Sequence, residues 1–320
     1  MVPAADSFDV YFGQIWQDRF SLSSTAIYPV EFFGSVMPVP CHSHNDYWRR
    51  TPLFAALGSG CVSIEADVWL EDGDLLVGHT RHTLRGNATL RNMYIDPLAR
   101  ILRVINTPRS SSHATPVEPL GVFYNDPAQT LTLLVDFKTP SAETLPVLLA
   151  QLQPLRDAGW LTHWNGTERI TRPITVVASG SVDFDALVAN RTYRDVFYDA
   201  PLEALEDDSD GHLSPDDDGR PETLYDFKYN PSNSYFASVS LSKAVGPVLF
   251  SKLSPAQLQK VKRQIASARE RHLIPRYWGT PRWPRGLRDA IWAELVQEET
   301  GLLNVDDLRA MRKGNWGMWS

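Results

Sequence analysis

The sequence contains no run of about 18 or more apolar residues, the length that a membrane-spanning helix needs. Its first residues, MVPAADSFDVYF, lack the basic and apolar regions of a signal peptide. Three Asn-x-Thr sequons, at Asn87, Asn165 and Asn190, point weakly toward the secretory pathway. We therefore expect a secreted or membrane-associated protein rather than a cytoplasmic one, with any targeting segment missing from this chain.

Cysteine is scarce, with Cys41 and Cys61 as the two residues of this type. Two cysteines are too few for a structural zinc site. They are expected near opposite ends of neighbouring strands, where disulfide geometry is hard to reach. The sequence therefore predicts two buried thiols.

An excess of positive charge is also missing, since the net charge is −7. The stretch 206–219 holds seven acids, and the rest of the chain has 31 acids against 31 bases. A balanced body argues against a nucleic-acid partner, which requires a strong positive field. The acidic stretch is predicted to be a surface loop, because it lacks the pattern of a calcium-binding loop.

Strand-like runs alternate with amphipathic helical patterns such as 141–159 and 253–271, and this alternation predicts βαβ units. The nine runs are 35–41, 61–67, 75–79, 131–137, 173–179, 195–200, 235–241, 273–278 and 301–307. We predict an α/β fold with a single (β/α)8 TIM-type barrel, regular or irregular, over residues 34–320. Residues 1–33 would form an N-terminal extension. A barrel of this type needs eight strands, so one run is peripheral, and we expect it to be 195–200.

Ionisable or amide side chains follow the first four strand-like runs at their carboxyl ends, a position that becomes one rim of a parallel barrel and is where active sites lie. These residues are His44, Asn45, Glu65, Asp67, His79, Asp136 and Lys138. Glu65 and Asp67 lie two residues apart and share a strand face, which favours a hard cation between them. Two histidines can exchange protons near neutral pH, and a lysine can stabilise phosphate charge. The set suits phosphoryl transfer.

These residues resemble the core of the phospholipase C-like phosphodiesterase superfamily, which includes phosphatidylinositol-specific phospholipases C, glycerophosphodiester phosphodiesterases and sphingomyelinase D-type phospholipases. Within that superfamily the chain looks like the fungal "altered inheritance of mitochondria" phosphodiesterase-like family. The resemblance runs from about residue 28 to 310. It rests on four blocks: CHSHNDYWRRTPLFAALGSGCVSIEADVWL, DPAQTLTLLVDFKT, RYWGTPRWP and LLNVDDL.

The resemblance implies that His44 and His79 are the catalytic acid and base. It further implies that Mg²⁺ or Ca²⁺ is bound by four residues, which are Glu65, Asp67, Asp136 and Asn45. Lys138 would contact the phosphate, and Trp278 would line the mouth of the site. Around this set, His42 is expected to support the site, Asp46 to form a turn or an outer contact, and Arg49 and Arg50 to be surface charges.

The expected function is a divalent-metal-dependent phosphoric diester hydrolase that acts on a phospholipid or glycerophosphodiester, either through a cyclic phosphate or directly with water. Tryptophans near the C-terminus are compatible with peripheral membrane contact, although most are expected to lie in the core. One alternative is a barrel hydrolase for a small phosphorylated metabolite. The other is a degenerate barrel that binds lipid or a partner without catalysis, which the complete set of site residues disfavours.

Overall fold

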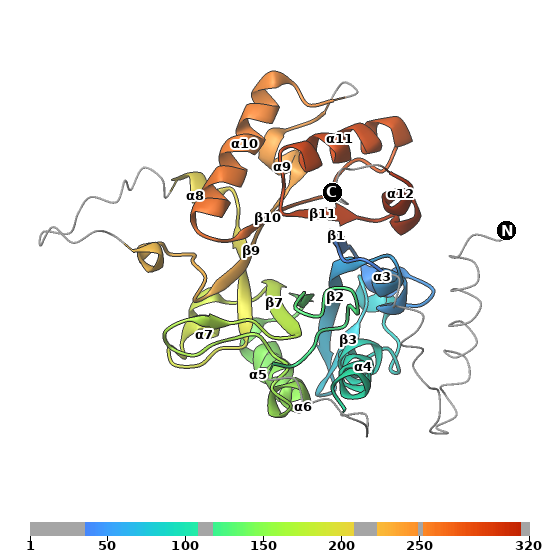
Figure 1. The fold of residues 1–320 in the computed structure, drawn as a ribbon, viewed down its shortest axis with the longest axis vertical. Coiled ribbons are helices and arrows are strands. Elements are labelled where there is room, and N and C mark those ends of the chain that lie inside the picture. Colours follow the sequence, from blue (N-terminus) through green and yellow to red (C-terminus); the bar gives the residue numbers. More distant parts are fainter. Residues whose placement is uncertain (1–35, 108–117, 208–222, 249–251, 315–320) are drawn as a thin grey trace, which may run out of the picture.

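The structure, a computed structural model, describes residues 36–107, 118–207, 223–248 and 252–314. Within these residues eight parallel strands close into a barrel (Figure 1), which confirms the predicted TIM-type fold. The order around the barrel is β1-β11-β10-β9-β8-β7-β4-β2, and pairing of β1 with β2 closes it. The barrel strands are β1 (Val39–Ser43), β2 (Cys61–Glu71), β4 (Leu131–Phe137), β7 (Ile174–Gly180), β8 (Val196–Pro201), β9 (Ser234–Ser240), β10 (Ile274–Trp278) and β11 (Leu302–Val305).

The peripheral strand was predicted wrongly. The run 195–200 forms β8, which pairs with β7 and β9 inside the barrel. The extra strand is β3 (Asp74–Val77), which runs antiparallel to the far half of β2. A tight turn at Asp72 and Gly73, both with positive φ, reverses the chain between them. Of the first four strand-like runs, the third is therefore not a parallel barrel strand, and His79 follows an antiparallel strand.

Helices cover the outside of the barrel (Figure 1) and connect its strands. The helices are α3 (Phe54–Gly58), α4 (Asp96–Asn106), α5 (Ser141–Gln151), α6 (Gln153–Asp157), α7 (Phe184–Val188), α8 (Ala204–Asp207), α9 (Leu241–Val245), α10 (Pro255–Glu270), α11 (Arg285–Gln297) and α12 (Leu308–Lys313). Short helical turns are η1 (Asp46–Trp48), η2 (Arg81–Thr83), η3 (Arg91–Ile95) and η5 (Leu224–Asp226). A small hairpin joins β5 (His163–Trp164) to β6 (Arg169–Ile170) ahead of β7.

The barrel interior changes from apolar to polar along the strands. Four buried side chains, Leu134, Val177, Phe236 and Leu302, form a compact apolar cluster. Two residues further along their strands, Leu134 leads to Asp136 and Val177 to Ser179. Because residues two apart share a strand face, the polar side chains stand above this apolar plug at the carboxyl rim. The plug closes the barrel below the site.

The prediction of two buried thiols is wrong, because Cys41 and Cys61 form a disulfide. Both residues are fully buried, as expected. The error lay in the placement of the first strand. It continues to Ser43, and Val39 pairs with Cys61 before an irregularity in the register. Cys41 therefore lies beside the start of β2, and the two Cα atoms are 4.7 Å apart.

The predicted extension over 1–33 and residues 208–219 of the acidic stretch lie outside the described residues. In the part of the chain that the structure describes, no helix combines the length and the apolar character that crossing a membrane requires.

Candidate active site

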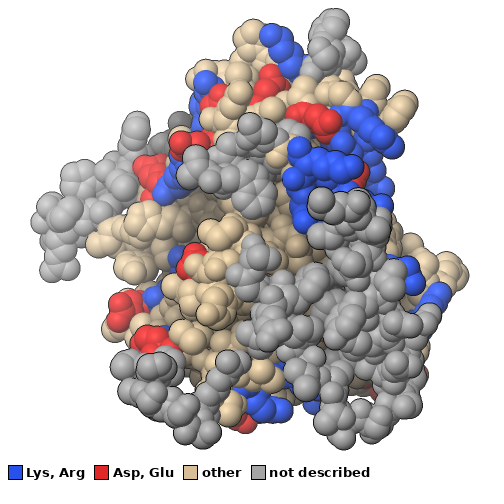
Figure 2. Space-filling view, turned by 45° about the vertical axis from the view of Figure 1, so that its right-hand side comes forward, with Lys and Arg blue, Asp and Glu red and all other residues tan. Residues whose placement is uncertain are grey.

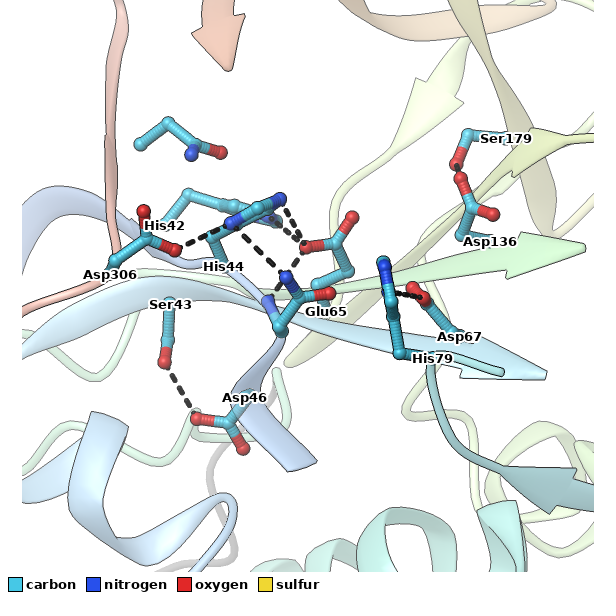
Figure 3. A network of polar contacts seen from close by, with 12 residues as sticks. His42, Ser43, His44, Asp46, Glu65, Asp67, His79, Asp136, Ser179 and Asp306 are labelled. Atoms are coloured by element: carbon cyan, nitrogen blue, oxygen red, sulfur yellow. Dashed lines mark hydrogen bonds and ion pairs between the residues drawn. The ribbon is translucent and has the colours of Figure 1, made fainter. Parts of the chain in front are cut away.

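Polar residues gather at the carboxyl rim in several groups joined by hydrogen bonds and ion pairs (Figure 3), with His44 and His79 on either side of Glu65 in this view. β1, β2 and β4 supply most of them. Asp67 of β2 stands directly opposite Asp136 of β4, which in turn stands opposite Ser179 of β7. The parallel register therefore brings side chains that are far apart in the sequence to one level of the rim.

His44 follows β1 and is held through its Nδ1 atom. Nδ1 lies 2.7 Å from Asp306 Oδ1, just after β11, and Nε2 lies 3.6 Å from Glu65 Oε2. Arg282 donates from Nε to Asp306 Oδ2 at 2.9 Å. Burial opposes ionisation of Asp306, yet the hydrogen bond from His44 and the charges of His44 and Arg282 lower the pKa of this carboxyl. An ionised Asp306 fixes the imidazole with Nε2 toward the rim.

The turn after β1 is ordered by Asp46, as predicted. This buried carboxylate accepts hydrogen bonds from Ser43 Oγ at 2.7 Å and from the Leu53 backbone N–H at 2.5 Å. Asn45 adopts the left-handed conformation with φ of 46°, which asparagine tolerates better than most residues. Its backbone N–H consequently donates to Glu65 Oε2 at 2.9 Å. The turn thus fixes Glu65 and presents the Asn45 side chain to the site.

Arg49 departs from its expected role as a surface charge. It is partly buried and donates to the backbone oxygens of Asp306 at 2.5 Å and Val305 at 3.2 Å. The guanidinium therefore ties the turn after β1 to the end of β11, which keeps His44 and Asp306 together. Arg50 is exposed, as expected.

His79 reaches the rim because β3 returns alongside β2. The Gly78 backbone N–H donates to the backbone carbonyl oxygen of Asp67 at 3.1 Å, and His79 Nδ1 lies 3.1 Å from the carboxylate oxygen Oδ2 of Asp67. Tyr47 adds a hydroxyl that lies 2.8 Å from the same carboxylate oxygen and 2.6 Å from Asn45 Oδ1. Like His44, His79 is held through Nδ1 by an acid, which leaves Nε2 for another partner.

Lys138 shares a face with Asp136, as predicted, and contacts both neighbouring acids. Its Nζ atom lies 2.7 Å from Asp136 Oδ1 and 3.1 Å from Asp67 Oδ2. Burial alone would lower the pKa of this ammonium, but the two carboxylates outweigh burial and raise it. Ser179 donates to the other oxygen of Asp136 at 2.9 Å. Lys138 is therefore a fixed positive charge at the rim.

Two buried side chains below the rim, His42 and Arg276, influence the pKa of the carboxylate of Glu65. His42 is fully buried, and burial together with the charge of Arg276 lowers its pKa to about 4, so it is neutral at pH 7. Its Nε2 lies 3.6 Å from Glu65 Oε2. Burial would raise the pKa of Glu65, but His42, His44 and Arg276 together lower it. By contrast, burial and the charge of Glu65 raise the pKa of Asp67.

The donor set fits a hard divalent cation in kind but not in its present arrangement. Carboxylate and amide oxygens are the ligands that Mg²⁺ and Ca²⁺ prefer, and Glu65, Asp67, Asp136 and Asn45 all lie at one rim. Among the described residues, however, no three His, Cys, Asp or Glu side chains already surround a common point. The ammonium of Lys138 lies between Asp67 and Asp136 instead. An ion between these two acids would require Lys138 to turn aside.

Trp278 ends β10 and is 42% exposed. Two further tryptophans are exposed in loops that follow barrel strands, Trp48 after β1 and Trp283 after β10. The Trp48 ring contacts His79 with centroids 5.2 Å apart, and the guanidinium of Arg282 lies over the Trp48 ring, 5.9 Å from its centroid. Trp292, in contrast, is buried in the core.

Comparisons with known proteins agree with this architecture. The family described as "AIM6-like phosphodiesterase domain" matches residues 30–199. A relative in Arthroderma benhamiae, named altered inheritance of mitochondria protein 6 homolog, is 36% identical over 295 residues, which is 89% of this chain and 86% of the relative.

The chain belongs to the AIM6-like phosphodiesterase family. Altered inheritance of mitochondria protein 6 of Eremothecium gossypii is 36% identical over 85% of this chain and 68% of its own length. The Saccharomyces cerevisiae protein of the same name is 33% identical over 85% of this chain and 70% of its own length. No solved structure matches the chain. The predicted resemblance is confirmed, and the family is of the phosphodiesterase type.

Proposed function

We propose that this AIM6-like protein is a divalent-metal-dependent phosphodiesterase that cleaves a phospholipid or a glycerophosphodiester. The observation that carries the proposal is the matched arrangement of His44 and His79. Each is held through Nδ1 by a carboxylate, Asp306 or Asp67, at 2.7 Å and 3.1 Å. Both therefore present Nε2 as the atom that accepts or gives a proton, on a rim that also carries a lysine.

The two histidines divide the proton transfers of an in-line displacement. One Nε2 takes the proton from the attacking hydroxyl, and the other returns a proton to the leaving oxygen. The attacking hydroxyl is either a neighbouring group of the substrate, which gives a cyclic phosphate, or water. Lys138, whose charge is fixed by Asp67 and Asp136, turns toward the phosphate and stabilises the charge that builds up on its oxygens.

Glu65, Asp67, Asp136 and the amide oxygen of Asn45 would hold Mg²⁺ or Ca²⁺. When bound, the ion supplies positive charge to a phosphate oxygen. Tyr47 contacts both Asn45 Oδ1 and Asp67 Oδ2 and so orients two of these oxygens. His42, neutral and buried beneath Glu65, supports the site from below without taking part in proton transfer.

Peripheral contact with a membrane is supported by the aromatic rim. Trp278 at the end of β10, and Trp48 and Trp283 in segments that follow β1 and β10, are exposed at the carboxyl end of the barrel, and tryptophan favours the membrane–water interface. Lys and Arg side chains gather at the upper right of the face in Figure 2, which would favour anionic lipid. An aggregated lipid would thus be held at the rim with its phosphate diester toward His44 and His79.

The test is a phosphorus NMR screen of lipid classes and glycerophosphodiesters in Mg²⁺, in Ca²⁺ and in EDTA. We expect one class to turn over with a divalent cation and to stop in EDTA, with product shifts that separate cyclic from linear phosphates. His44→Ala and His79→Ala should each lower kcat by about 10²–10⁴-fold, the scale of a positioned proton-transfer group. His82→Ala, which removes an exposed histidine three residues from His79, is the matched control.

A second candidate, lipid binding without catalysis, is favoured by the position of Lys138 between the two acids. That function predicts vesicle binding but unchanged phosphorus spectra with every cation. It further predicts that Lys138→Ala gives no gain in Mg²⁺ binding by calorimetry. In the phosphodiesterase, removal of this competing ammonium leaves the acids free, and Mg²⁺ binds more tightly than before.

A further inference from the structure

Three N-glycosylation sequons lie on the surface of the described residues. They are Asn87-Ala88-Thr89, Asn165-Gly166-Thr167 and Asn190-Arg191-Thr192, and the asparagine of each is exposed. A glycan needs room outside the fold, so burial of any of the three asparagine side chains would have excluded the modification. All three asparagines are exposed, although Thr89 of the first sequon is buried.

Two of the sequons share a local geometry that directs the reactive nitrogen outward. Asn165 Oδ1 accepts from the N–H of Thr167 at 2.9 Å and from its hydroxyl at 2.8 Å. Asn190 Oδ1 accepts from the N–H and the hydroxyl of Thr192, both at 3.0 Å. Because the amide oxygen faces the backbone in each turn, the Nδ2 atom to which a sugar would be joined faces away from it.

These two sequons lie at the end of the barrel opposite the candidate active site. Asn165 lies in the β5–β6 hairpin before β7, and Asn190 lies between α7 and β8, so both precede the amino ends of barrel strands. The Trp164 backbone N–H donates to the Arg194 oxygen at 2.7 Å, which holds the two loops side by side. Glycans at this end leave the carboxyl rim open to substrate.

The disulfide is an independent observation that points to the same compartment. Cys41 and Cys61 are bonded to each other and are the only cysteines of the chain. Structural disulfides form and persist in oxidising compartments, whereas reducing compartments keep thiols free. Compartments that oxidise such pairs include the one in which sequons are glycosylated.

We infer that this protein matures in the oxidising lumen of the secretory pathway and carries N-linked glycans on Asn87, Asn165 and Asn190. In the transfer, Asn Nδ2 bonds to the anomeric carbon of a lipid-linked oligosaccharide diphosphate. The carbon–oxygen bond to the diphosphate breaks, the lipid diphosphate leaves, and one Nδ2 proton passes to a base. In disulfide formation, the two thiols give two electrons and two protons to a protein disulfide, which is reduced.

The test uses the full-length protein isolated from the cells that naturally make it. Peptide-N-glycosidase treatment in ¹⁸O-water should convert the three asparagines to ¹⁸O-labelled aspartates and increase the mobility of the protein on a gel. An asparagine that stays unlabelled carries no glycan. If all three stay unlabelled, the inference is overturned. Because both cysteines are buried, alkylation is done in denaturant; before reduction it should leave Cys41 and Cys61 unmodified, and alkylation of both would overturn the oxidising compartment.

Matched variants at one sequon separate the glycan from the fold. Thr167→Ala keeps Asn165 but destroys the sequon, and should lose one glycan. Thr167→Ser keeps the sequon and should retain it. If both variants migrate like the wild-type protein before and after glycosidase treatment, Asn165 carries no glycan. Neither residue lies in the candidate active site, so turnover should be unchanged in both.

Discussion

Asp306 offers the sharpest test of the proposed proton transfer, because it touches His44 and would not touch the substrate. Its carboxylate accepts from His44 Nδ1 at 2.7 Å and is itself held by Arg282. We interpret it as a positioning residue that keeps the proton on Nδ1 and leaves Nε2 free to act. Asp306→Asn retains the shape of the side chain but removes the negative charge.

The size of the effect follows from this one contact. A hydrogen bond to a charged group contributes about 1.5–3 kcal/mol. Its loss in the transition state therefore lowers kcat by about 10–150-fold, at about 1.4 kcal/mol for each factor of ten. KM should change little, since Asp306 lies behind the imidazole. The assay is steady-state hydrolysis of bis(4-nitrophenyl) phosphate with Mg²⁺, together with the substrate found in the phosphorus NMR screen.

Two measurements separate positioning from folding. The downfield proton resonance of His44 Nδ1–H should disappear in Asp306→Asn, whereas thermal unfolding should stay cooperative. Asp72→Asn makes the same chemical change at an exposed turn and should leave kcat unaltered. A kcat for Asp306→Asn within about threefold of the wild-type value, with the His44 resonance lost, would refute the role given to His44, since a group that must transfer a proton cannot tolerate the loss of its partner.

The disulfide, the charge of Asp306 and the rim residues Lys138 and Trp278 can each be tested by substitution. Cys41→Ser/Cys61→Ser should lower the free energy of unfolding by about 3 kcal/mol, because the disulfide closes a loop over a separation of 20 residues; equal urea midpoints for oxidised and reduced wild-type protein would contradict this. Because the pKa of Asp306 is lowered in the folded state, its ionised carboxylate stabilises the fold above the ordinary carboxyl pKa, and this contribution is lost as pH falls. The difference in free energy of unfolding between the wild-type protein and Asp306→Asn, measured in urea, should therefore narrow below about pH 4. Lys138→Ala should impair turnover of vesicle lipid and of a short soluble diester alike, whereas Trp278→Ala should impair the vesicle substrate far more; equal losses for Trp278→Ala would favour a small-metabolite substrate.

The barrel could be predicted because its signals are local. Each strand-like run in the sequence is a strand in the structure, and apolar runs such as LTLLV end in acids where the strand reaches the rim. Side-chain alternation alone places Asp136 and Lys138 on one face, and their 2.7 Å contact follows. Here a period of two residues carries enough information to locate part of a site.

Pairing between strands could not be predicted in the same way. The error at Cys41 and Cys61 came from a strand that begins and ends a few residues later than expected, which changed which residues stand opposite each other. The error at β8 also concerned pairing. The composition of a run does not show whether it is a barrel strand or a strand that folds back on its neighbour. The run 75–79 reads like the others, and its direction is decided by the turn at Asp72 and Gly73.

That reversal explains why His79 was found by a rule that does not apply to it. It ends an antiparallel strand, and it reaches the rim because β2 extends beyond the barrel and β3 returns to the level of Asp67. Asp306, in contrast, obeys the rule, since it directly follows β11 at the rim, but it lies outside the first four strand-like runs, whose carboxyl ends supplied the predicted acids and histidines. Tyr47 obeys no rule of spacing, because its hydroxyl enters the site from a turn. The proposed acid and base therefore depend on long-range strand pairing at His79 and on the last barrel strand at His44. Sequence periodicity alone could supply the two histidines but not their partners.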